Sequence, residues 1–76
     1  MPRVKFAIPP EQLALEDALR DRYGGMMDTR SVGKELGVKD TAAAKWLDGV
    51  TYVLVNNRRR YPVRHVAEKI YLSTNT

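Results

Sequence analysis

Three adjacent arginines, Arg58, Arg59 and Arg60, are the residues of this 76-residue sequence that point most directly to a chemistry. They lie in the stretch VNNRRRYP, residues 55–62, between a short apolar run and a tyrosine-proline pair. A guanidinium group is always charged, can bind a phosphate through two hydrogen bonds, and fits a narrow minor groove, where the potential is most negative. The stretch is therefore typical of a contact with a polyanion. The alternative is a solvated charge cluster that only prevents the edge of a strand from pairing.

The distribution of charge supports a polyanionic partner. The chain carries 13 basic and 9 acidic side chains, a net charge of +4. Residues 1–28 hold four basic and five acidic side chains, a net charge of −1, whereas residues 29–76 hold nine and four, a net charge of +5. The C-terminal two-thirds is thus expected to face the polyanion. A basic domain without such a partner is the alternative.

The same composition argues against catalysis and against bound metals or cofactors. There is no cysteine, so disulfides, thiolate zinc sites and cysteine nucleophiles are excluded. His65 is the only histidine and has no second ligand to share a metal. Ser31 and Ser73 have no partner arrangement for nucleophilic catalysis. We expect no enzyme activity, no catalytic or metal-binding residue, and no cofactor.

The chain is expected to form one domain over residues 1–76, with residues 1–25 as an extension and residues 27–71 as the core motif. It has no apolar stretch long enough for a membrane helix and no signal peptide at its N-terminus. A cytoplasmic protein with no membrane partner is the expectation.

The extension is predicted to contain a strand at residues 4–8 and a helix at about residues 10–23, which Gly24 and Gly25 end. This helix is expected to pack on the domain or to serve as a surface for oligomerisation. Its apolar residues are Leu15, Ala18, Leu19 and Tyr23. Its carboxylates are expected to form one solvated face: Glu11, Glu16, Asp17 and Asp21.

Two further helices are predicted within residues 26–49. Asp28 or Thr29 can cap a short helix that ends at Leu36, where Gly37 supplies a left-handed residue. Asp40 or Thr41 can start a second helix that runs to about residue 48. Two helices joined by a short turn containing glycine form a helix-turn-helix, with an ordinary helical hairpin as the alternative. Gly33 would let the helices approach, and the apolar contacts would come from Val32, Leu36, Val38, Ala43 and Trp46, with Leu47 also turned inward.

A β-hairpin is predicted next, over residues 51–61. Asn56 and Asn57 tolerate the positive φ of a two-residue turn, which pairs Val55 with Arg58 and Val53 with Arg60. Period-two alternation then puts Arg58 and Arg60 on the open face and Arg59 toward the core side. The buried face would hold Tyr52, Leu54 and Tyr61. From Pro62 a last helix begins, with Val63, Val66, Ala67 and Ile70 at helical spacing.

Helix-turn-helix, hairpin and closing helix together predict a mainly α domain with a β-hairpin, the winged helix-turn-helix fold. At this point the sequence resembles the small excisionase and MerR-type winged helix-turn-helix DNA-binding domains over residues 27–71. TRSVGKELGVKDTAAAKWLDG resembles the two-helix unit, VNNRRRYP the basic wing, and VRHVAEKI the closing helix. Asn56 and Asn57 stand where the wing usually has glycines. The sequence departs from the family at Lys39 and Arg64, where Ser or Thr caps are common.

Double-stranded DNA is accordingly the expected partner. The second helix offers few groups that could read bases, so affinity should come mainly from phosphates and specificity from DNA shape. RNA is a weaker expectation because Tyr52, Tyr61 and Trp46 are assigned to the core rather than to base stacking. The candidate DNA-binding residues are Arg30, Lys34, Lys39, Thr41, Ala42, Lys45, Asn57, Arg58, Arg59 and Arg60.

The resemblance further implies a DNA-bending excisionase of a phage or another mobile element. Such a recombination directionality factor binds adjacent DNA sites, can self-associate there, and acts with an integrase, which would place the protein at the nucleoid. Nothing follows the last short helix, whereas MerR-type regulators carry a long dimerisation helix. A small winged-helix transcriptional regulator is the alternative. A protein-interaction module that uses the N-terminal helix is a second alternative.

Overall fold

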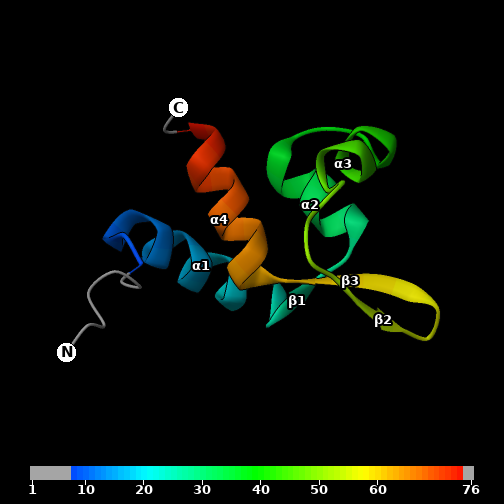
Figure 1. The fold of residues 1–76 in the computed structure, drawn as a ribbon, viewed down its shortest axis with the longest axis horizontal. Coiled ribbons are helices and arrows are strands. Elements are labelled where there is room, and N and C mark those ends of the chain that lie inside the picture. Colours follow the sequence, from blue (N-terminus) through cyan, green and yellow to red (C-terminus); the bar gives the residue numbers. More distant parts are fainter. Residues whose placement is uncertain (1–7, 75–76) are drawn as a thin grey trace.

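The computed structural model describes residues 8–74. The strand expected at residues 4–8 lies outside these residues, except for Ile8, which is not in a strand. The described chain contains four helices and three short strands (Figure 1). In chain order they are α1 (Pro10–Tyr23), β1 (Met26–Met27), α2 (Thr29–Leu36), α3 (Asp40–Trp46), β2 (Val53–Val55), β3 (Arg58–Pro62) and α4 (Val63–Thr74). Within the described residues, no helix combines the length and the apolar character needed to cross a membrane.

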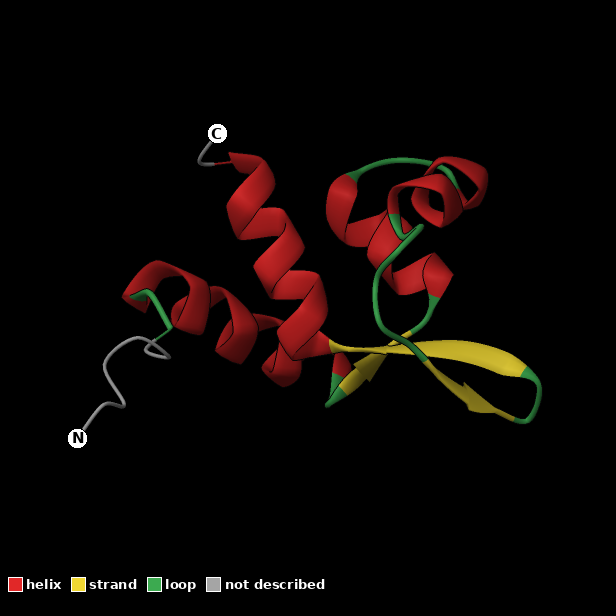
Figure 2. Ribbon diagram, in the orientation of Figure 1, coloured by secondary structure: helices red, strands yellow, loops and turns green. Residues whose placement is uncertain are grey.

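The three strands form one antiparallel sheet in the order β1-β3-β2, so β3 lies in its centre. The hairpin of β2 and β3 has the predicted register, with Val55 opposite Arg58 and Val53 opposite Arg60. Asn56 and Asn57 have φ angles of 54° and 64°, the left-handed values that a tight hairpin turn requires. The predicted turn is therefore confirmed. Figure 2 shows the hairpin projecting beyond the helices.

The helix pair, residues 29–46, begins and turns largely as predicted. The Asp28 carboxylate accepts a hydrogen bond from the Ser31 N–H, and Gly37 is left-handed with φ 74°. The cap of α3 differs from the prediction: Lys39 occupies the N-cap without a side-chain hydrogen bond, and Asp40 is the first helical residue. Helix α3 also ends at Trp46 rather than near residue 48, because tighter turns follow, with Asp48 N–H donating to the Lys45 carbonyl.

One hydrophobic core holds these elements together. Helix α4 packs against α1 and contributes three of the nine core residues, while α1, β1, β3 and the segment of the helix pair up to Leu47 supply the others. The core residues are Leu19, Met27, Val32, Ala43, Leu47, Tyr61, Val63, Val66 and Ala67, with Leu15, Tyr23, Leu36, Trp46, Val50 and Ile70 packed around them. The small domain thus keeps every helix in contact with one shared core.

Several residues expected to be buried lie at the surface. Leu54 is 62% exposed and Tyr52 is 42% exposed, because the part of the hairpin that carries them extends beyond the helices that could cover it. Val38 is exposed because it follows the left-handed Gly37 in the turn rather than facing the core. Ala18 lies on the outer side of α1. The predicted buried face of the hairpin is therefore correct for Tyr61 alone.

Glu16 is the opposite case, a residue that was expected to be exposed and is buried. The sequence predicts it on a solvated face, yet it is only 7% exposed, because Gln12, Glu16 and Leu19 share the side of α1 that is buried. Its Oε2 atom accepts a hydrogen bond from Arg20 Nη2 at 2.8 Å, whereas Oε1 has no partner among the described residues. A carboxylate in such a position is retained at a desolvation cost that the Arg20 ion pair offsets in part.

Gly33 sets how closely the helix pair can approach. A Cβ atom there would lie 2.9 Å from the Val38 carbonyl oxygen and 3.4 Å from the Ala43 Cβ. We expect Gly33→Ala to lower the free energy of unfolding by about 1 kcal/mol. This follows because overpacking against backbone costs about 1–3 kcal/mol and the gain in helix propensity returns about 1 kcal/mol.

Urea unfolding of Gly33→Ala beside Gly25→Ala measures this effect. Gly25 is the matched control because nothing lies within 4 Å of its added Cβ and its φ is not positive. A Gly33→Ala variant as stable as the control would show that separating the helices costs no more than the gain in helix propensity returns.

Candidate nucleic-acid interface

A hollow of about 450 Å³ lies where the hairpin meets the starts of both helices of the helix pair. Thr29 and Arg30 come from the start of α2, and Arg58 and Arg59 from β3. Two carboxylates complete its lining, Asp28 and Asp40. We call these six residues the basic hollow. Three arginines from segments far apart in the sequence thus line one open hollow.

The hairpin turn positions the two arginines of the hollow. Arg58 directly follows the turn, and its side chain forms no ion pair among the described residues. The Arg59 guanidinium lies over the Tyr52 ring, 4.4 Å from its centroid. A hydrogen bond with the Tyr61 side chain, and then the Tyr52 charge, raise the pKa of Arg59 above its already high value. Arg59 therefore stays fully charged while the tyrosines limit its movement.

Arg60 has a different environment from its two neighbours. Its Nη1 atom lies 3.4 Å from Asp28 Oδ2, while the other Asp28 oxygen accepts the Ser31 N–H at 2.8 Å. This backbone hydrogen bond is the main cause that lowers the pKa of Asp28, and the Arg60 charge contributes as well. Asp28 thus connects β3 to the start of α2. Arg60 holds the hairpin against the helix pair instead of lining the hollow.

The other candidate residues lie at the surface outside the basic hollow. They are exposed in the described structure, while Ala43 and Leu47 of the same region are buried as predicted. The exposed residues of this group are Lys34, Lys39, Thr41, Ala42, Lys45 and Asn57. The structure therefore brings together Arg30, Arg58 and Arg59 from the predicted set. It pairs Arg60 with Asp28 and leaves the other six residues exposed outside the hollow.

Asp40 and Thr29 belong to the hollow although the sequence pattern does not assign them to the site. The pattern identifies Asp40 only as a start of the second helix, and Thr29 only as a cap of the first. Both residues are the first residues of their helices, and both helix starts converge on the hairpin. The capping pattern in the sequence therefore indicated where each residue lies in its helix. Their proximity to the arginines depends on tertiary packing.

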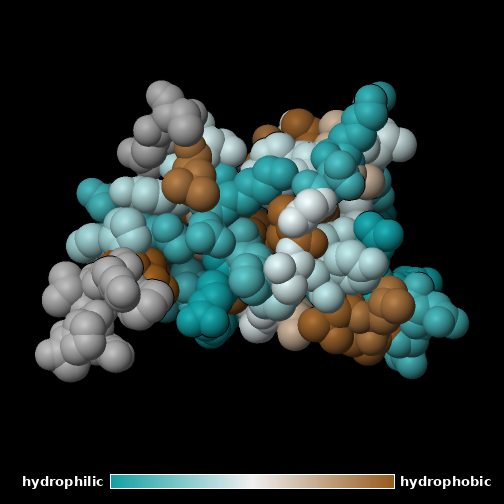
Figure 3. All heavy atoms as spheres, viewed as in Figure 1, coloured by the Kyte–Doolittle hydropathy of each residue, from teal (hydrophilic) through white to brown (hydrophobic). Residues whose placement is uncertain are grey.

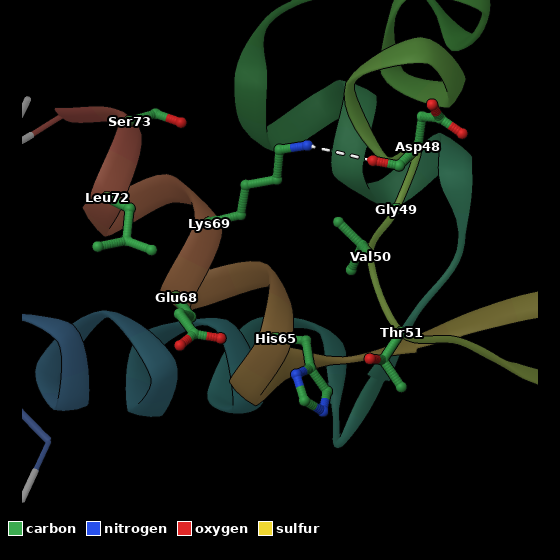
Figure 4. A pocket seen from close by; sticks show the side chains of 9 residues that line it. All are labelled: Asp48, Gly49, Val50, Thr51, His65, Glu68, Lys69, Leu72 and Ser73. Atoms are coloured by element: carbon green, nitrogen blue, oxygen red, sulfur yellow. Dashed lines mark hydrogen bonds between the residues drawn. The ribbon is translucent and has the colours of Figure 1, made fainter. Parts of the chain in front are cut away.

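Helix α3 is fixed at its other end by Lys69 of α4. The Lys69 ammonium donates a hydrogen bond to the main-chain oxygen of Trp46 and lies 3.5 Å from the main-chain oxygen of Asp48. It also lies 5.0 Å from the centroid of the Trp46 ring. Figure 4 shows this side chain reaching across a second hollow, of about 540 Å³, between α4 and residues 48–51. His65 lies half-buried at its edge. The lysine therefore holds the carbonyl end of α3 in a fixed orientation.

Helix α1 is connected to the helix pair by a polar cluster around Glu35. Arg22 Nη1 lies 2.5 Å from Glu35 Oε1, and the Tyr23 hydroxyl donates to the same oxygen at 3.0 Å. Burial is the main cause that raises the pKa of Tyr23.

No group of three or more His, Cys, Asp or Glu side chains that could hold a metal occurs within residues 8–74.

Comparison of the chain with protein-family models, curated proteins and solved structures gives no match. The functional argument therefore depends on the residues and contacts described above.

The cap at Asp28 predicts a specific pH dependence of stability. Since the pKa of Asp28 is lowered from its ordinary 3.8 in the folded protein, its contribution is present above that value and is lost as the pH falls through the folded pKa. Asp28→Ala should lower the free energy of unfolding by about 1 kcal/mol near neutral pH, and the difference from the wild type should shrink in acid.

Urea unfolding curves at about pH 7 and about pH 2.5 measure the difference. Asp28→Asn is the control, because an amide oxygen can still cap the helix but carries no charge. An Asp28→Ala deficit that is equally large at both pH values would contradict the role of the ionised carboxylate.

Proposed function

We propose that the protein binds double-stranded DNA as a winged helix-turn-helix. In this proposal, α2 and α3 form the helix-turn-helix and α3 enters the major groove. The β2–β3 hairpin is the wing, which lies over the adjacent phosphates and minor groove.

The basic hollow is the observation that carries the proposal. Its three guanidinium groups come from Arg30, Arg58 and Arg59, and the arginines of the hairpin meet the starts of the two helices there. A phosphate could enter between them and receive hydrogen bonds from guanidinium forks and the Thr29 hydroxyl. A charge cluster that served only to prevent strand pairing would have no need to meet the helices in this way.

Readout of bases by α3 is limited in this arrangement. Thr41 and Lys45 can donate to base edges or phosphates, and Ala42 can contact a thymine methyl group. Asp40 can accept from a cytosine amino group, but its charge also repels nearby phosphates. Affinity would then come mainly from phosphates, and specificity from the shape and deformability of the DNA.

The narrower role implied by the sequence resemblance is that of an excisionase acting with an integrase, and it stays a prediction. Footprinting distinguishes it from the transcriptional regulator. An array of close direct repeats on bent DNA would favour the excisionase, whereas a single inverted repeat over a promoter would favour the regulator.

Removing both hairpin arginines of the hollow tests the wing. Arg58→Ala combined with Arg59→Ala should weaken binding to all duplex sequences. It should also reduce the slope of log affinity against log salt by about 2, since each phosphate that the protein neutralises contributes about 0.9 to this slope. Mobility-shift titrations at several salt concentrations measure both quantities.

Arg64→Ala is the control, because it removes an exposed arginine of α4 that does not line the hollow. A double variant with an unchanged slope would remove the wing from the interface. If the wild-type protein gave no shift at any salt concentration, the protein-interaction hypothesis would replace DNA binding.

Asp40 gives a second test, in which the substitution should strengthen DNA binding instead of weakening it. Asp40→Asn removes a negative charge from the basic hollow, so it should tighten binding to random duplex DNA by roughly threefold at low salt, with a smaller gain at high salt. Asp21→Asn is the matched control, because this exposed aspartate of α1 does not line the basic hollow and the change in net charge is the same. Equal gains in the two variants would mean that only overall charge matters and that the hollow is not a phosphate site.

A further inference from the structure

Strand β2 and Tyr52, the residue before it, form an apolar surface that the proposed DNA contact does not explain. The four consecutive residues Tyr52, Val53, Leu54 and Val55 are between 42% and 62% exposed, and none of them carries a charge. Figure 3 shows an apolar area over the hairpin, next to the hydrophilic atoms at its end. We call residues 52–55 the apolar edge. Natural edge strands usually carry a lysine, a proline or a bulge that prevents pairing, and β2 has none of these.

The backbone of the apolar edge is also available for pairing. Strand β2 is the last strand of the sheet, so its outer side faces no other strand in the described structure. The pair that flanks a two-residue turn exchanges both hydrogen bonds and the next pair exchanges none, so Leu54, opposite Arg59, does not bond to β3. The N–H and C=O groups of Leu54 therefore point to the open side.

Charge next to this edge restricts the partner. Each residue of β2 lies opposite an arginine of β3, so an added strand would run one strand away from Arg58, Arg59 and Arg60. The hairpin of a second copy would add three more arginines and no carboxylate, so it would not complement the charge of β3. DNA interfaces are polar and wet, and they do not require a row of exposed aliphatic side chains.

We propose that the apolar edge binds an extended segment of another protein, one in which apolar residues alternate with Asp or Glu. The segment adds a strand to the sheet beside β2. Its backbone pairs with Leu54. On one face of the sheet its apolar side chains lie beside Val53 and Val55, and on the other face its carboxylates lie beside Leu54 and are directed toward Arg59. The hairpin then has two functions: β3 carries the cations, and β2 carries the protein-binding edge.

A labelled peptide tests the proposal without depending on DNA binding. The probe is a short fluorescein-labelled peptide in which Val alternates with Glu, and fluorescence anisotropy measures its affinity. We expect Leu54→Pro to weaken binding by about tenfold, because it removes the outward N–H while leaving the ladder to β3 intact. Leu54→Ala should have a smaller effect, and Leu72→Ala, at an exposed leucine of α4, should have none.

Three further measurements protect the test from a folding defect. Thermal melting checks that Leu54→Pro is folded. The wild-type protein is also titrated with a peptide that carries proline at alternate positions, which blocks pairing from the other side. Hydrogen exchange should show slower exchange of the Leu54 amide when the Val-Glu peptide is bound.

Other results would overturn the proposal. Equal binding by Leu54→Pro would show that the edge backbone is not used, and equal binding of a Val-Lys peptide would show that the arginines do not select acids. Protection of the Leu54 amide by duplex DNA would assign the edge to the DNA interface. The same protection on raising the protein concentration alone would assign it to a second copy. Mobility shifts on duplex DNA separately measure the proposed DNA function, so either idea can fail alone.

Discussion

The arrangement of the molecule depends on the central strand β3. One end of this strand carries three arginines beyond the core, and the other end buries Tyr61 against β1 and leads directly into α4 through Pro62. Because Tyr61 is fixed in the core, the positions of Arg58, Arg59 and Arg60 are set by the length and twist of the strand. Charged side chains that would otherwise sample many positions are thus held at one place beside the helix pair.

Polar contacts around this strand determine which cations are available. Asp28 connects β3 to α2 through Arg60, and Lys69 holds the far end of α3. One arginine and one lysine are thus used for positioning, and Arg30, Arg58 and Arg59 are left around the hollow. The neighbouring strand β2 is apolar and exposed, since the hairpin projects past all four helices (Figure 1). An apolar edge in solvent tends to pair, so its presence is easier to understand if a partner covers it.

The individual elements followed from residue types that act on their own neighbourhood. Asp28, Gly37, and the Asn56–Asn57 pair act on adjacent backbone, so the first helix of the pair, its end, and the hairpin register could be predicted from the sequence. The spacing of Val63, Val66, Ala67 and Ile70 likewise indicated the buried side of α4, because helical periodicity is a local property.

Which faces are covered, and which cations meet, depended on how the whole chain packs. Alternation placed Leu54 and Tyr61 on one face, but it could not show that the helices stop short of Leu54. The burial of Glu16 depends on how α1 packs against α4, which overrides the expectation that a carboxylate faces solvent. The meeting of Arg30 with Arg58 and Arg59 depends on the sheet that brings the hairpin to the start of α2. Residues so far apart in the sequence meet only through tertiary packing, and local pattern carries no information about such contacts.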